Sequence, residues 1–574
     1  SKVINHHQDV PFRVLERKYS FDENGQHNED NGSENMIIRG DNLEALKALL
    51  PRYEGRVKCI YIDPPYNTGN EGWVYNDNVN DPKIKKWLGE VVGKEGEDLT
   101  RHDKWLCMMY PRLKLLQKLL ADDGVIFISI DDTEYANLKL ICDEIFGSNC
   151  FVSNISWQRT YSTRNDSKGI VNEVEHLVVY SKLPDWNPNK LPRTAEMDAK
   201  YKNPDNDRTL WRTDNAFAPG AATHQGMVYA IQHPFTGKML YPSNGACWRY
   251  QQDQMLEIMR GWCGYELRDL NDAHERAVVC GVPESDVRQG VQAIVLSESL
   301  EISAQKAQAV YDRGQWPRFF FTKGGKGGIA RKTYLENVGG KLPTNFWAFT
   351  ETGHTDEAKK EMLAIFDGKA TFDTPKPHRL IEFVLKVAGN ENALILDSFA
   401  GSGTTAHAVL NMNKADGGHR KFILVEMMDY ADSITAERVK RVIRGYGEGK
   451  NAVEGTGGNF SFYDLGEPLL VGDCLNEAVA PEKIREYIWF MDTKQPYAPP
   501  SGGNPYYLGK HNSTGYYFYY EPQHVTVLDY AFLSTITEKA DGTVIFADRC
   551  SISEGKLAKM GVTFKKIPRD ISRL

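Results

Sequence analysis

Paired cysteines, long apolar runs and a positive net charge are all missing from this sequence. Its nine cysteines include no pair at CxxC spacing, which argues against a zinc site or a disulfide framework. No run of about 18 consecutive apolar residues occurs, so we expect no transmembrane helix. The opening residues, SKVINHHQDV, are polar and lack the apolar core of a signal peptide. A reducing cytoplasm is therefore the expected compartment.

The net charge of −8 argues mildly against a nucleic acid as partner, because phosphate binding needs local positive charge. It does not exclude one, since a basic groove can exist on a molecule that is acidic overall. A phosphate loop has Ser or Thr directly after its Gly-Lys pair. Here Gly449-Lys450 precedes Asn451, and Gly325-Lys326 precedes Gly327, so ATP hydrolysis is not expected.

The length of 574 residues suggests several domains, and two parts of the chain share an α/β rhythm. Short apolar runs rich in β-branched residues predict strands at 57–63, 124–130, 175–182, 393–397 and 421–426. Apolar residues at helical spacing predict helices at 43–50, 104–120 with an interruption at Pro111, 375–388, 404–413 and 435–444. Polar or glycine-rich composition predicts a loop at 20–35, a mobile flap at 67–102 and a linker at 445–460.

The pattern changes between residues 183 and 345. Helices are expected at 251–280 and 285–312, between polar loops rich in Asn, Pro and Trp. The tail beyond about residue 467 carries aromatic β-like runs and predicts a small α+β domain. We therefore divide the chain into four parts, which are 1–182, 183–345, 346–460 and 461–574.

A glycine-rich turn follows the strand that ends at Asp397. It comprises Phe399, Ala400, Gly401, Ser402, Gly403, Thr404 and Thr405, and it opens a helix. The next strand ends at Glu426, whose carboxylate is placed to bind both hydroxyls of a ribose. The glycine pattern is not GxGxxG, so an adenosine-bearing ligand without pyrophosphate, such as S-adenosylmethionine, fits better than a nicotinamide. The alternative is a tight turn that merely joins strand to helix.

A second turn, Asp63-Pro64-Pro65-Tyr66, follows the strand at 57–63 (the DPPY turn). Its prolines fix φ near −65° and remove amide donors, which leaves an Asp carboxylate and backbone carbonyls as acceptors. Two acceptors would favour a pyramidal amine with an available lone pair, while Tyr66 would stack on the ring that carries it. The alternative is a proline turn in which Asp63 is a cap; the nearby glycine-rich turn makes that alternative weaker.

These two turns together resemble the signature of amino-methyltransferases that act on DNA. The order, with DPPY before FAGSGT, is that of the permuted β group. Further segments resemble the modification (Mod) subunit of type III restriction–modification systems: DPPYNTG with YND (75–77), FISIDDTE (127–134), PFTGKMLYPSNGACWR (234–249), FDTPKPHRLI (372–381) and FKKIPRDI (564–571). The resemblance covers most of the chain.

The resemblance implies a fold and an activity. The expected fold is a doubly wound, mostly parallel, seven-stranded Rossmann-like methyltransferase sheet, with an inserted target-recognition domain and a small C-terminal α+β domain. The expected activity is methyl transfer from S-adenosylmethionine to N6 of a flipped adenine in double-stranded DNA, with no metal. Homodimers and a possible restriction subunit with helicase and nuclease activity are the implied partners.

It also implies site residues. Asp63 and the Pro64 carbonyl would hold the adenine amine, with Pro65 shaping the turn and Tyr66 stacking on the base. The glycine-rich turn from Asp397 to Thr405 would surround the methionine part of the cofactor, and Glu426 the ribose. Four more residues would line the cofactor pocket: Asp41, Asn42, Lys376 and Pro377.

Residues for DNA contact are expected mainly in the central region. Arg, Lys, Asn and Trp side chains suit phosphate and base-edge contacts. The candidates are Asn67, Arg212, Trp248, Arg249, Arg318, Lys323, Lys326, Arg331 and Lys332. Each could instead be a solvated surface charge or, for Trp248, a core residue.

Several rival functions stay open at the level of sequence. Cytosine N4 offers the same kind of amine, although enzymes acting on it more often carry Ser in place of Asp63. A protein-glutamine methyltransferase would typically have Asn at that position and no large central insertion. The remaining rivals are a solitary DNA methylase and a non-enzymatic DNA-binding scaffold with an inactive methylase fold.

Overall fold

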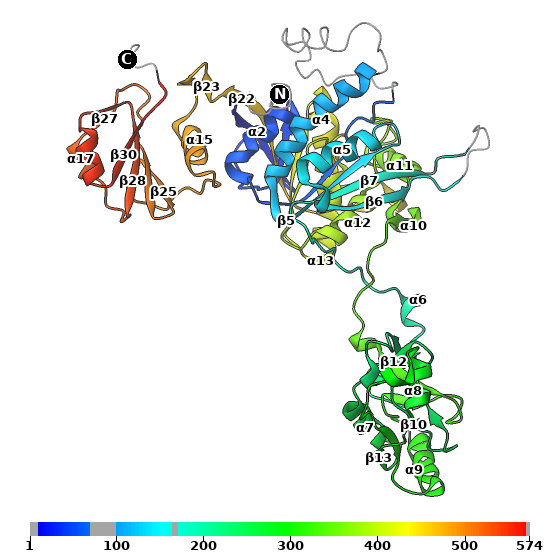
Figure 1. Cartoon of the computed structure of the whole chain (residues 1–574). Helices are drawn as coiled ribbons and strands as arrows, with labels where there is room; N and C mark the ends of the chain where they lie inside the picture. The colour runs from blue at the N-terminus through cyan, green and yellow to red at the C-terminus, as the bar shows by residue number, and fades with distance from the viewer. Residues whose placement is uncertain (1–9, 69–98, 163–169, 570–574) are drawn as a thin grey trace. The chain divides into compact units, whose positions relative to one another are not determined.

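A computed structural model of the chain describes residues 10–68, 99–162 and 170–569 (Figure 1). It separates into two compact units: Ser1–Asn189 with Pro343–Leu574, and Lys190–Leu342. The second unit lies within the insertion expected at 183–345. The flap expected at 67–102 falls largely outside the described residues.

A mixed sheet of eleven strands, counted over the described residues, forms the centre of the first unit. The strand order is β17-β6-β7-β5-β4-β18-β19-β3-β22-β1-β2. Their bounds are β17 (Phe346–Trp347), β6 (Phe151–Gln158), β7 (Val174–Ser181), β5 (Leu120–Ile130), β4 (Val57–Ile62), β18 (Leu394–Asp397), β19 (Lys421–Glu426), β3 (Met36–Arg39), β22 (Phe460–Pro468), β1 (Arg13–Asp22) and β2 (Gly25–His27). The run from β5 to β22 is parallel, whereas β7 is antiparallel to both of its neighbours and β1 is antiparallel to β22 and β2.

Burial on both faces explains why these strands are apolar throughout. In β4, Ile60 and Ile62 pack in one core, and the alternation of a strand points Cys59 and Tyr61 to the opposite face; all four are buried. Two groups of helices pack against the sheet. One comprises α2 (Asn42–Tyr53), α4 (Leu99–Leu119) and α5 (Tyr135–Phe146); the other comprises α10 (Phe349–Thr352), α11 (Thr355–Ile365), α12 (His378–Ala388), α13 (Thr404–Asp416) and α14 (Glu437–Arg444).

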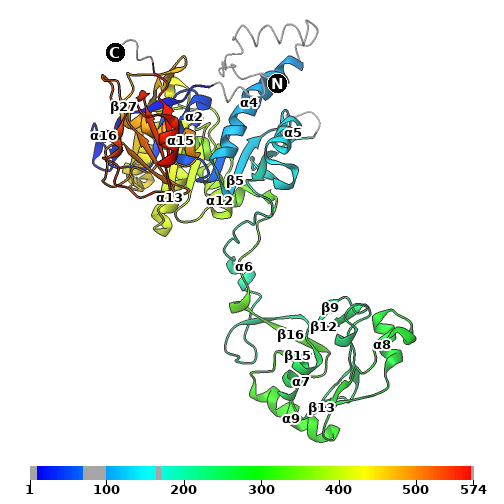
Figure 2. The same ribbon diagram turned by 60° about the vertical axis from the view of Figure 1, so that its left-hand side comes forward.

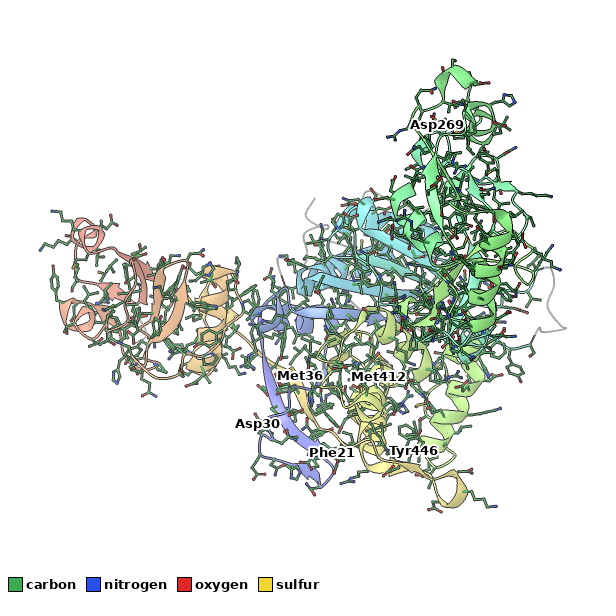
Figure 3. The ribbon with its side chains drawn as sticks, turned by 90° about the horizontal axis from the view of Figure 1, so that it is seen from below. Phe21, Asp30, Met36, Asp269, Met412 and Tyr446 are labelled. Atoms are coloured by element: carbon green, nitrogen blue, oxygen red, sulfur yellow. The ribbon has the colours of Figure 1, made fainter. Side chains whose placement is uncertain are left out.

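Three side chains labelled in Figure 3 show that both strands and helices contribute buried residues to this unit. Phe21 on β1, Met36 on β3 and Met412 on α13 are all buried. Among the described residues, no helix is both long enough and apolar enough to cross a bilayer.

The edges of the sheet differ from the prediction. It has four more strands than the seven expected, because β17 extends one edge and β22, β1 and β2 extend the other. Residues 20–27, predicted to be loop, belong to the β1–β2 hairpin, where Ser20 pairs with His27. The boundary predicted at 461 falls inside β22, whose residues Ser461–Asp464 pair with β3 and whose residues up to Pro468 pair with β1. The β1–β2 hairpin carries a weak apolar signal, which is why composition alone assigned residues 20–27 to a loop.

Two helix predictions are also corrected. α4 runs through Pro111 without interruption from Leu99 to Leu119, and α2 likewise contains Pro51. In the central region, 251–280 is not one helical stretch. It forms α7 (Gln252–Arg260), β13 (Tyr265–Arg268) and α8 (Ala273–Cys280), and the segment after it forms β14 (Ala293–Leu296) and α9 (Leu300–Arg313).

The second unit has its own aromatic core. Its main sheets are four-stranded, β11-β10-β14-β13, and three-stranded, β15-β16-β8, with a β9–β12 pair (Figure 2). Trp211, Trp248 and Trp262 are buried in one cluster with Phe319 and Phe321. The remaining elements are α6 (Ala195–Asp198), β8 (Trp211–Asn215), β9 (Phe217–Pro219), β10 (Ile231–Gln232), β11 (Met239–Leu240), β12 (Ala246–Trp248), β15 (Phe319–Phe321) and β16 (Ile329–Tyr334).

The chain after β22 forms a small α+β region. Its sheet has the order β25-β26-β28-β30, and the neighbouring strands β26 and β28 are parallel. The elements are β23 (Leu470–Val471), β24 (Cys474–Leu475), α15 (Pro481–Thr493), β25 (Tyr507–His511), β26 (Thr514–Phe518), β27 (Val527–Leu528), α16 (Tyr530–Leu533), β28 (Gly542–Ala547), β29 (Arg549–Cys550), α17 (Glu554–Lys559) and β30 (Val562–Lys566).

Candidate active site

The two turns singled out in the sequence meet at one edge of the large sheet. β4 and β18 are parallel neighbours, with Ile60 paired to Leu396, so the DPPY turn and the glycine-rich turn leave adjacent strands at their carboxyl ends. Ligands of open α/β sheets bind at this edge. Burial raises the pKa of Asp397 to about 7, and the nearby Asp63 carboxylate adds to the rise. The two halves therefore form one electrostatic environment.

The DPPY turn is held from beneath by side chains of α4 and of the segment before α5. The Trp105 indole donates to the Pro65 carbonyl at 2.7 Å. Asn67, with a φ of 62°, is buried and donates through its amide to Glu134 Oε1. No described residue donates to the Pro64 carbonyl. The Pro65 carbonyl thus anchors the turn to α4.

A cation and a second carboxylate complete this pocket. Lys376 Nζ lies 3.0 Å from Asp63 Oδ1, 2.8 Å from the Tyr66 hydroxyl and 3.2 Å from Glu175 Oε2. Glu175, on β7, also accepts from Arg159 Nη1 at 3.0 Å. Lys376 was expected beside the cofactor, and the structure places its ammonium in the DPPY pocket. Glu175 and Arg159 were not anticipated.

The charges of this pocket compensate one another. Burial raises the pKa of Asp63, although Lys376 opposes the rise. Burial alone would lower the pKa of Lys376, but Asp63 and Glu175 more than offset it and raise that pKa. For Glu175 the effect of burial is outweighed by Lys376 and Arg159, which lower its pKa. The pocket thus brings the carboxyl groups of Asp63 and Glu175 together with the basic side chains of Lys376 and Arg159.

Glycines of the glycine-rich turn stand where a side chain would clash. Gly403 has a φ of 83°, and a Cβ there would lie 2.9 Å from the Thr435 carbonyl oxygen. Gly401 has a φ of 51°, and its Cβ would lie 3.2 Å from the Phe372 ring. Glycine alone adopts these conformations at low cost. The turn is thereby drawn tightly around the space at the end of β18.

Carboxylates fix the shape of the same turn. Asp397 accepts from the Phe399 amide at 3.0 Å and from the Thr405 hydroxyl at 2.6 Å. Glu426 accepts from the Gly401 amide at 2.8 Å, and burial raises its pKa. The Ala400 amide donates to the Val425 carbonyl, which ties the turn to β19.

Asp41 and Asn42, predicted to line the cofactor pocket, lie against this turn. Asp41 caps α2 by accepting from the backbone amides of Leu43 and Glu44. The Asn42 amide donates to the Ser398 carbonyl at 3.1 Å, and Arg112 from α4 contacts both Asp41 and Asn42. Asp41 and Asn42 therefore support the glycine-rich turn from the side of β3.

The residues fit an adenosine-bearing cofactor. Ser398 Oγ is buried without a hydrogen-bond partner in the described part of the chain, which leaves a polar atom for a ligand. The acidic group at the end of β19 and the glycine turn supply the ribose and close-approach features of such a site. The Lys376 backbone lies against the glycine-rich turn, because the Thr404 hydroxyl donates to the Lys376 carbonyl at 3.2 Å.

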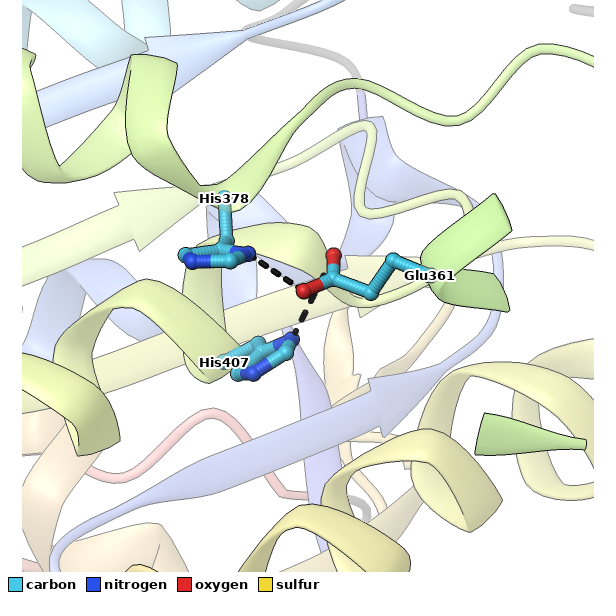
Figure 4. A group of neighbouring side chains, drawn as sticks. All are labelled: Glu361, His378 and His407. Carbon is cyan, nitrogen blue, oxygen red and sulfur yellow. Dashed lines mark ion pairs between the residues drawn. The ribbon is translucent and has the colours of Figure 1, made fainter. Parts of the chain in front are cut away.

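Behind the turn, α11, α12, α13 and α14 contribute a polar cluster, of which Figure 4 draws Glu361, His378 and His407. Glu361 on α11 accepts from His378 Nδ1 at 2.5 Å and from Arg438 Nη2 at 3.0 Å. Arg438 also donates to His407 Nδ1 at 3.1 Å. Burial opposes ionisation of Glu361, but the hydrogen bond from His378 and the nearby cations lower its pKa to about 2. The cluster was not predicted.

The spacing of Glu361, His378 and His407 would admit a metal ion. Arg438 nevertheless uses two of the atoms that an ion would need, and its positive charge opposes a cation there. Its other nitrogen, Nη1, donates to Ser402 Oγ at 2.9 Å and Thr404 Oγ1 at 2.8 Å. We interpret the cluster as the support of the glycine-rich turn.

Replacing Arg438 by methionine should destabilise this half of the unit strongly. The change leaves Glu361 as a buried carboxylate without its guanidinium partner, which typically costs about 3–5 kcal/mol. Thermal unfolding followed by calorimetry would measure the loss. As a control, Arg441→Met on the same helix removes partly exposed ion pairs with Glu437 and Asp367 and should cost less than Arg438→Met, because both carboxylates stay open to solvent.

The double variant Arg438→Met/Glu361→Gln separates charge from packing. Removing both charges should recover part of the stability lost by the single change, because no uncompensated carboxylate remains. A double variant with the summed losses of the two single variants would contradict this interpretation.

The residues predicted to contact DNA differ in their exposure to solvent. Arg249, Lys323 and Lys326 are exposed in the second unit. Arg212 is exposed too, whereas Arg331 is partly buried against Asp214.

Two of these candidates are wrong. Trp248 is buried, and its indole donates to the Tyr229 carbonyl. Lys332 is fully buried and ion-paired with Asp205 and Asp207. Neither side chain is open to a DNA surface, because each completes the core that holds the second unit together. Asn67, the candidate near the DPPY turn, is also buried and bonded to Glu134.

Comparison with known proteins places the site in a family context. Residues 57–437 match the family model described as DNA methylase. The chain is 33% identical over 440 residues to the type III restriction-modification enzyme StyLTI Mod subunit of Salmonella typhimurium, covering 72% of this chain and 58% of that protein. It is 31% identical over 434 residues to the EcoPI Mod subunit of Escherichia phage P1, covering 70% and 58%.

A relative of a different type matches at nearly the same level. The type II methyltransferase M.KpnI of Klebsiella pneumoniae is 30% identical over 399 residues, covering 69% of this chain and 81% of that protein. The chain thus spans less than two thirds of the length of the two Mod subunits.

Proposed function

Since the chain belongs to the DNA methylase family, we propose that it transfers a methyl group from S-adenosylmethionine to N6 of an adenine in double-stranded DNA. One observation carries the proposal. The acceptors of the DPPY turn and the cofactor-type glycine-rich turn stand on the neighbouring strands β4 and β18. An amine held by the first would lie beside a methyl donor held by the second.

The target base has to leave the duplex to reach this pocket. Flipping a base costs a few kcal/mol. The Asp63 carboxylate and the Pro64 carbonyl would then accept the two N–H groups of the amine, and Tyr66 would stack on the ring. When bound, S-adenosylmethionine supplies an electrophilic methyl group. The residues act mainly by positioning and electrostatics.

A strong base is not required in this scheme. The methylated nitrogen is an acidic ammonium, so water can take its proton. Asp63 needs only to be ionised when the base arrives, and its raised pKa sets how far the pH can fall before that condition fails. Accordingly, methyl transfer should decline toward acidic pH as Asp63 becomes protonated.

The wider assignment is a Mod subunit of a type III restriction–modification system. The Mod relatives and the inserted second unit support it. In this role the chain would form a homodimer, read an asymmetric site through the second unit and work with a restriction subunit. A solitary methylase is the second candidate, because M.KpnI matches over most of its own length.

Incubation of plasmid DNA with methyl-labelled S-adenosylmethionine, followed by digestion to nucleosides, tests the proposal. We expect the label in N6-methyl-2′-deoxyadenosine. Label in N4-methyl-2′-deoxycytidine would identify the cytosine alternative instead. Absence of any transfer would favour an inactive scaffold and overturn the proposed function.

The exposed glycine-rich loop at 323–328 should contact the DNA backbone. The double charge change Lys323→Glu/Lys326→Glu is expected to weaken DNA binding and to reduce the slope of log affinity against log salt by about 2, one for each lost phosphate contact. Fluorescence anisotropy at several salt concentrations measures both. Lys238→Glu, an exposed change in the same unit, is the matched control. An unaltered slope would count against the loop.

A further inference from the structure

Lys376 lies at the centre of the DPPY pocket. Its ammonium has three hydrogen-bond acceptors within reach, Asp63 Oδ1, the Tyr66 hydroxyl oxygen and Glu175 Oε2, at 2.8 to 3.2 Å. The side chain is only 11% exposed. An ammonium has three N–H donors, so the pocket satisfies all of them.

The position of this ammonium coincides with that expected for the target amine. Both groups are nitrogen donors that need the Asp63 carboxylate. Lys376 Nζ also lies 5.0 Å from the centre of the Tyr66 ring, in a cation–π contact on the face where a base would stack. A base and this ammonium cannot occupy the same space, so the lysine has to move before the amine can reach Asp63.

Glu175 offers the lysine a second resting place. Its carboxylate is almost fully buried and is kept ionised by Arg159 on one side and Lys376 on the other. The Lys376 carbonyl is held by the Thr404 hydroxyl, whereas its four-carbon stem has several rotatable bonds. A short rotation of the stem would release Asp63 and keep the ion pair with Glu175.

We propose that Lys376 is a positioning residue whose ammonium holds the place of the target amine against Asp63 in the empty pocket and moves onto Glu175 when the base enters. This inference rests on the proposed methyl transfer to an amine of DNA. It assigns Glu175 as the receiving carboxylate and Arg159 as the cation that keeps it charged.

The charges facing Asp63 make the idea testable by pH. They come from Lys376 before α12, Glu175 on β7 and Asp397 on β18, with Tyr66 in the turn and Arg159 behind Glu175. Without the lysine, Asp63 loses the cation that lowers its pKa, while the carboxylate that raises it remains. Asp63 would then protonate at a higher pH.

The experiment compares Lys376→Met with wild type in methyl transfer to plasmid DNA across pH. We expect the acidic limb of kcat/KM to move up by about one pH unit or more, a tenfold loss at a pH on that limb. At the alkaline plateau, where Asp63 is ionised without the lysine, the loss of rate should be smaller than on the acidic limb. Lys376→Arg should restore the limb. Lys386→Met, exposed on the last turn of α12, is the matched control.

Glu175→Gln tests the receiving site separately. In this variant Lys376 retains only Asp63 as a charged partner, so it competes more strongly with the entering base. We therefore expect KM for DNA to rise by more than kcat falls. An unmoved acidic limb in Lys376→Met, or a plateau about a hundredfold below wild type, would overturn the inference; the second result would make Lys376 a catalytic group. A wild-type protein that transfers no methyl group would instead refute the proposed function on which the inference rests. Cofactor binding by calorimetry confirms that each variant is folded.

Discussion

Asp63→Ala should reduce methyl transfer by about a hundredfold to a thousandfold while leaving the affinity for S-adenosylmethionine nearly unchanged. The carboxylate is the charged acceptor of the DPPY pocket, and removing one preorganised group of this kind commonly has such an effect. The cofactor half is built from other residues, on β18 and β19. Single-turnover methylation and isothermal calorimetry measure the two quantities on the same preparation.

Two further variants sharpen this prediction. Asp63→Asn keeps the shape of the side chain and one oxygen acceptor but removes the charge, so its rate should lie between those of wild type and Asp63→Ala. Asp122→Ala, an exposed change at the start of β5, should be indistinguishable from wild type. Methylation by Asp63→Ala at near wild-type rate would contradict the mechanism.

Glu426→Ala is expected to weaken S-adenosylmethionine binding by about tenfold to a hundredfold. The predicted ribose contacts are hydrogen bonds to a charged group, each worth about 1.5–3 kcal/mol. The buried carboxylate also accepts from the Gly401 amide at 2.8 Å and the Met428 amide at 3.0 Å, so its loss loosens the glycine-rich turn. Both effects act in the same direction. Calorimetry with the cofactor alone measures the change.

Glu426→Gln distinguishes charge from shape in this site. The amide retains one oxygen acceptor, so its affinity should lie between those of wild type and Glu426→Ala. Methyl transfer at saturating cofactor should recover in both variants, because the DPPY pocket is intact. Unchanged affinity in Glu426→Ala would remove the ribose assignment.

Local signals sufficed for the elements that build the site. The helix after Asp41 starts where an Asx cap and apolar spacing predicted it, and α2 uses Asp41 as its cap. The strand before the DPPY turn is continuous and apolar because both of its faces are buried. Each of these features is encoded within a few residues of itself, so the sequence alone reveals it.

The surroundings of the site depend on contacts that the sequence does not display. Glu175 lies in a strand whose pattern indicates only burial, and Arg159 follows another strand; they meet because β6 and β7 pair. Arg438, on α14, donates to Ser402 in the turn that precedes α13. The sequence offered one indication of such contacts, which is the charged Glu175 in a strand that continues as the apolar run LVVYS.

The errors have a common physical cause. Lys332 and Trp248 were assigned to DNA by residue type, whereas tertiary packing places both in the core of the second unit. A new domain was predicted to begin within residues 460–468, but these residues form β22, which lies in the large sheet beside β3. Whether a polar residue or an edge strand faces solvent is decided by partners far away in the chain.

Single-molecule sequencing of DNA modified by this chain tests the central claim most directly, because it reports the modified base and its context together. With wild-type protein we predict N6-methyladenine at one recurrent asymmetric sequence, and no such signal with Asp63→Ala. N4-methylcytosine, or N6-methyladenine that persists in the Asp63→Ala sample, would contradict the account.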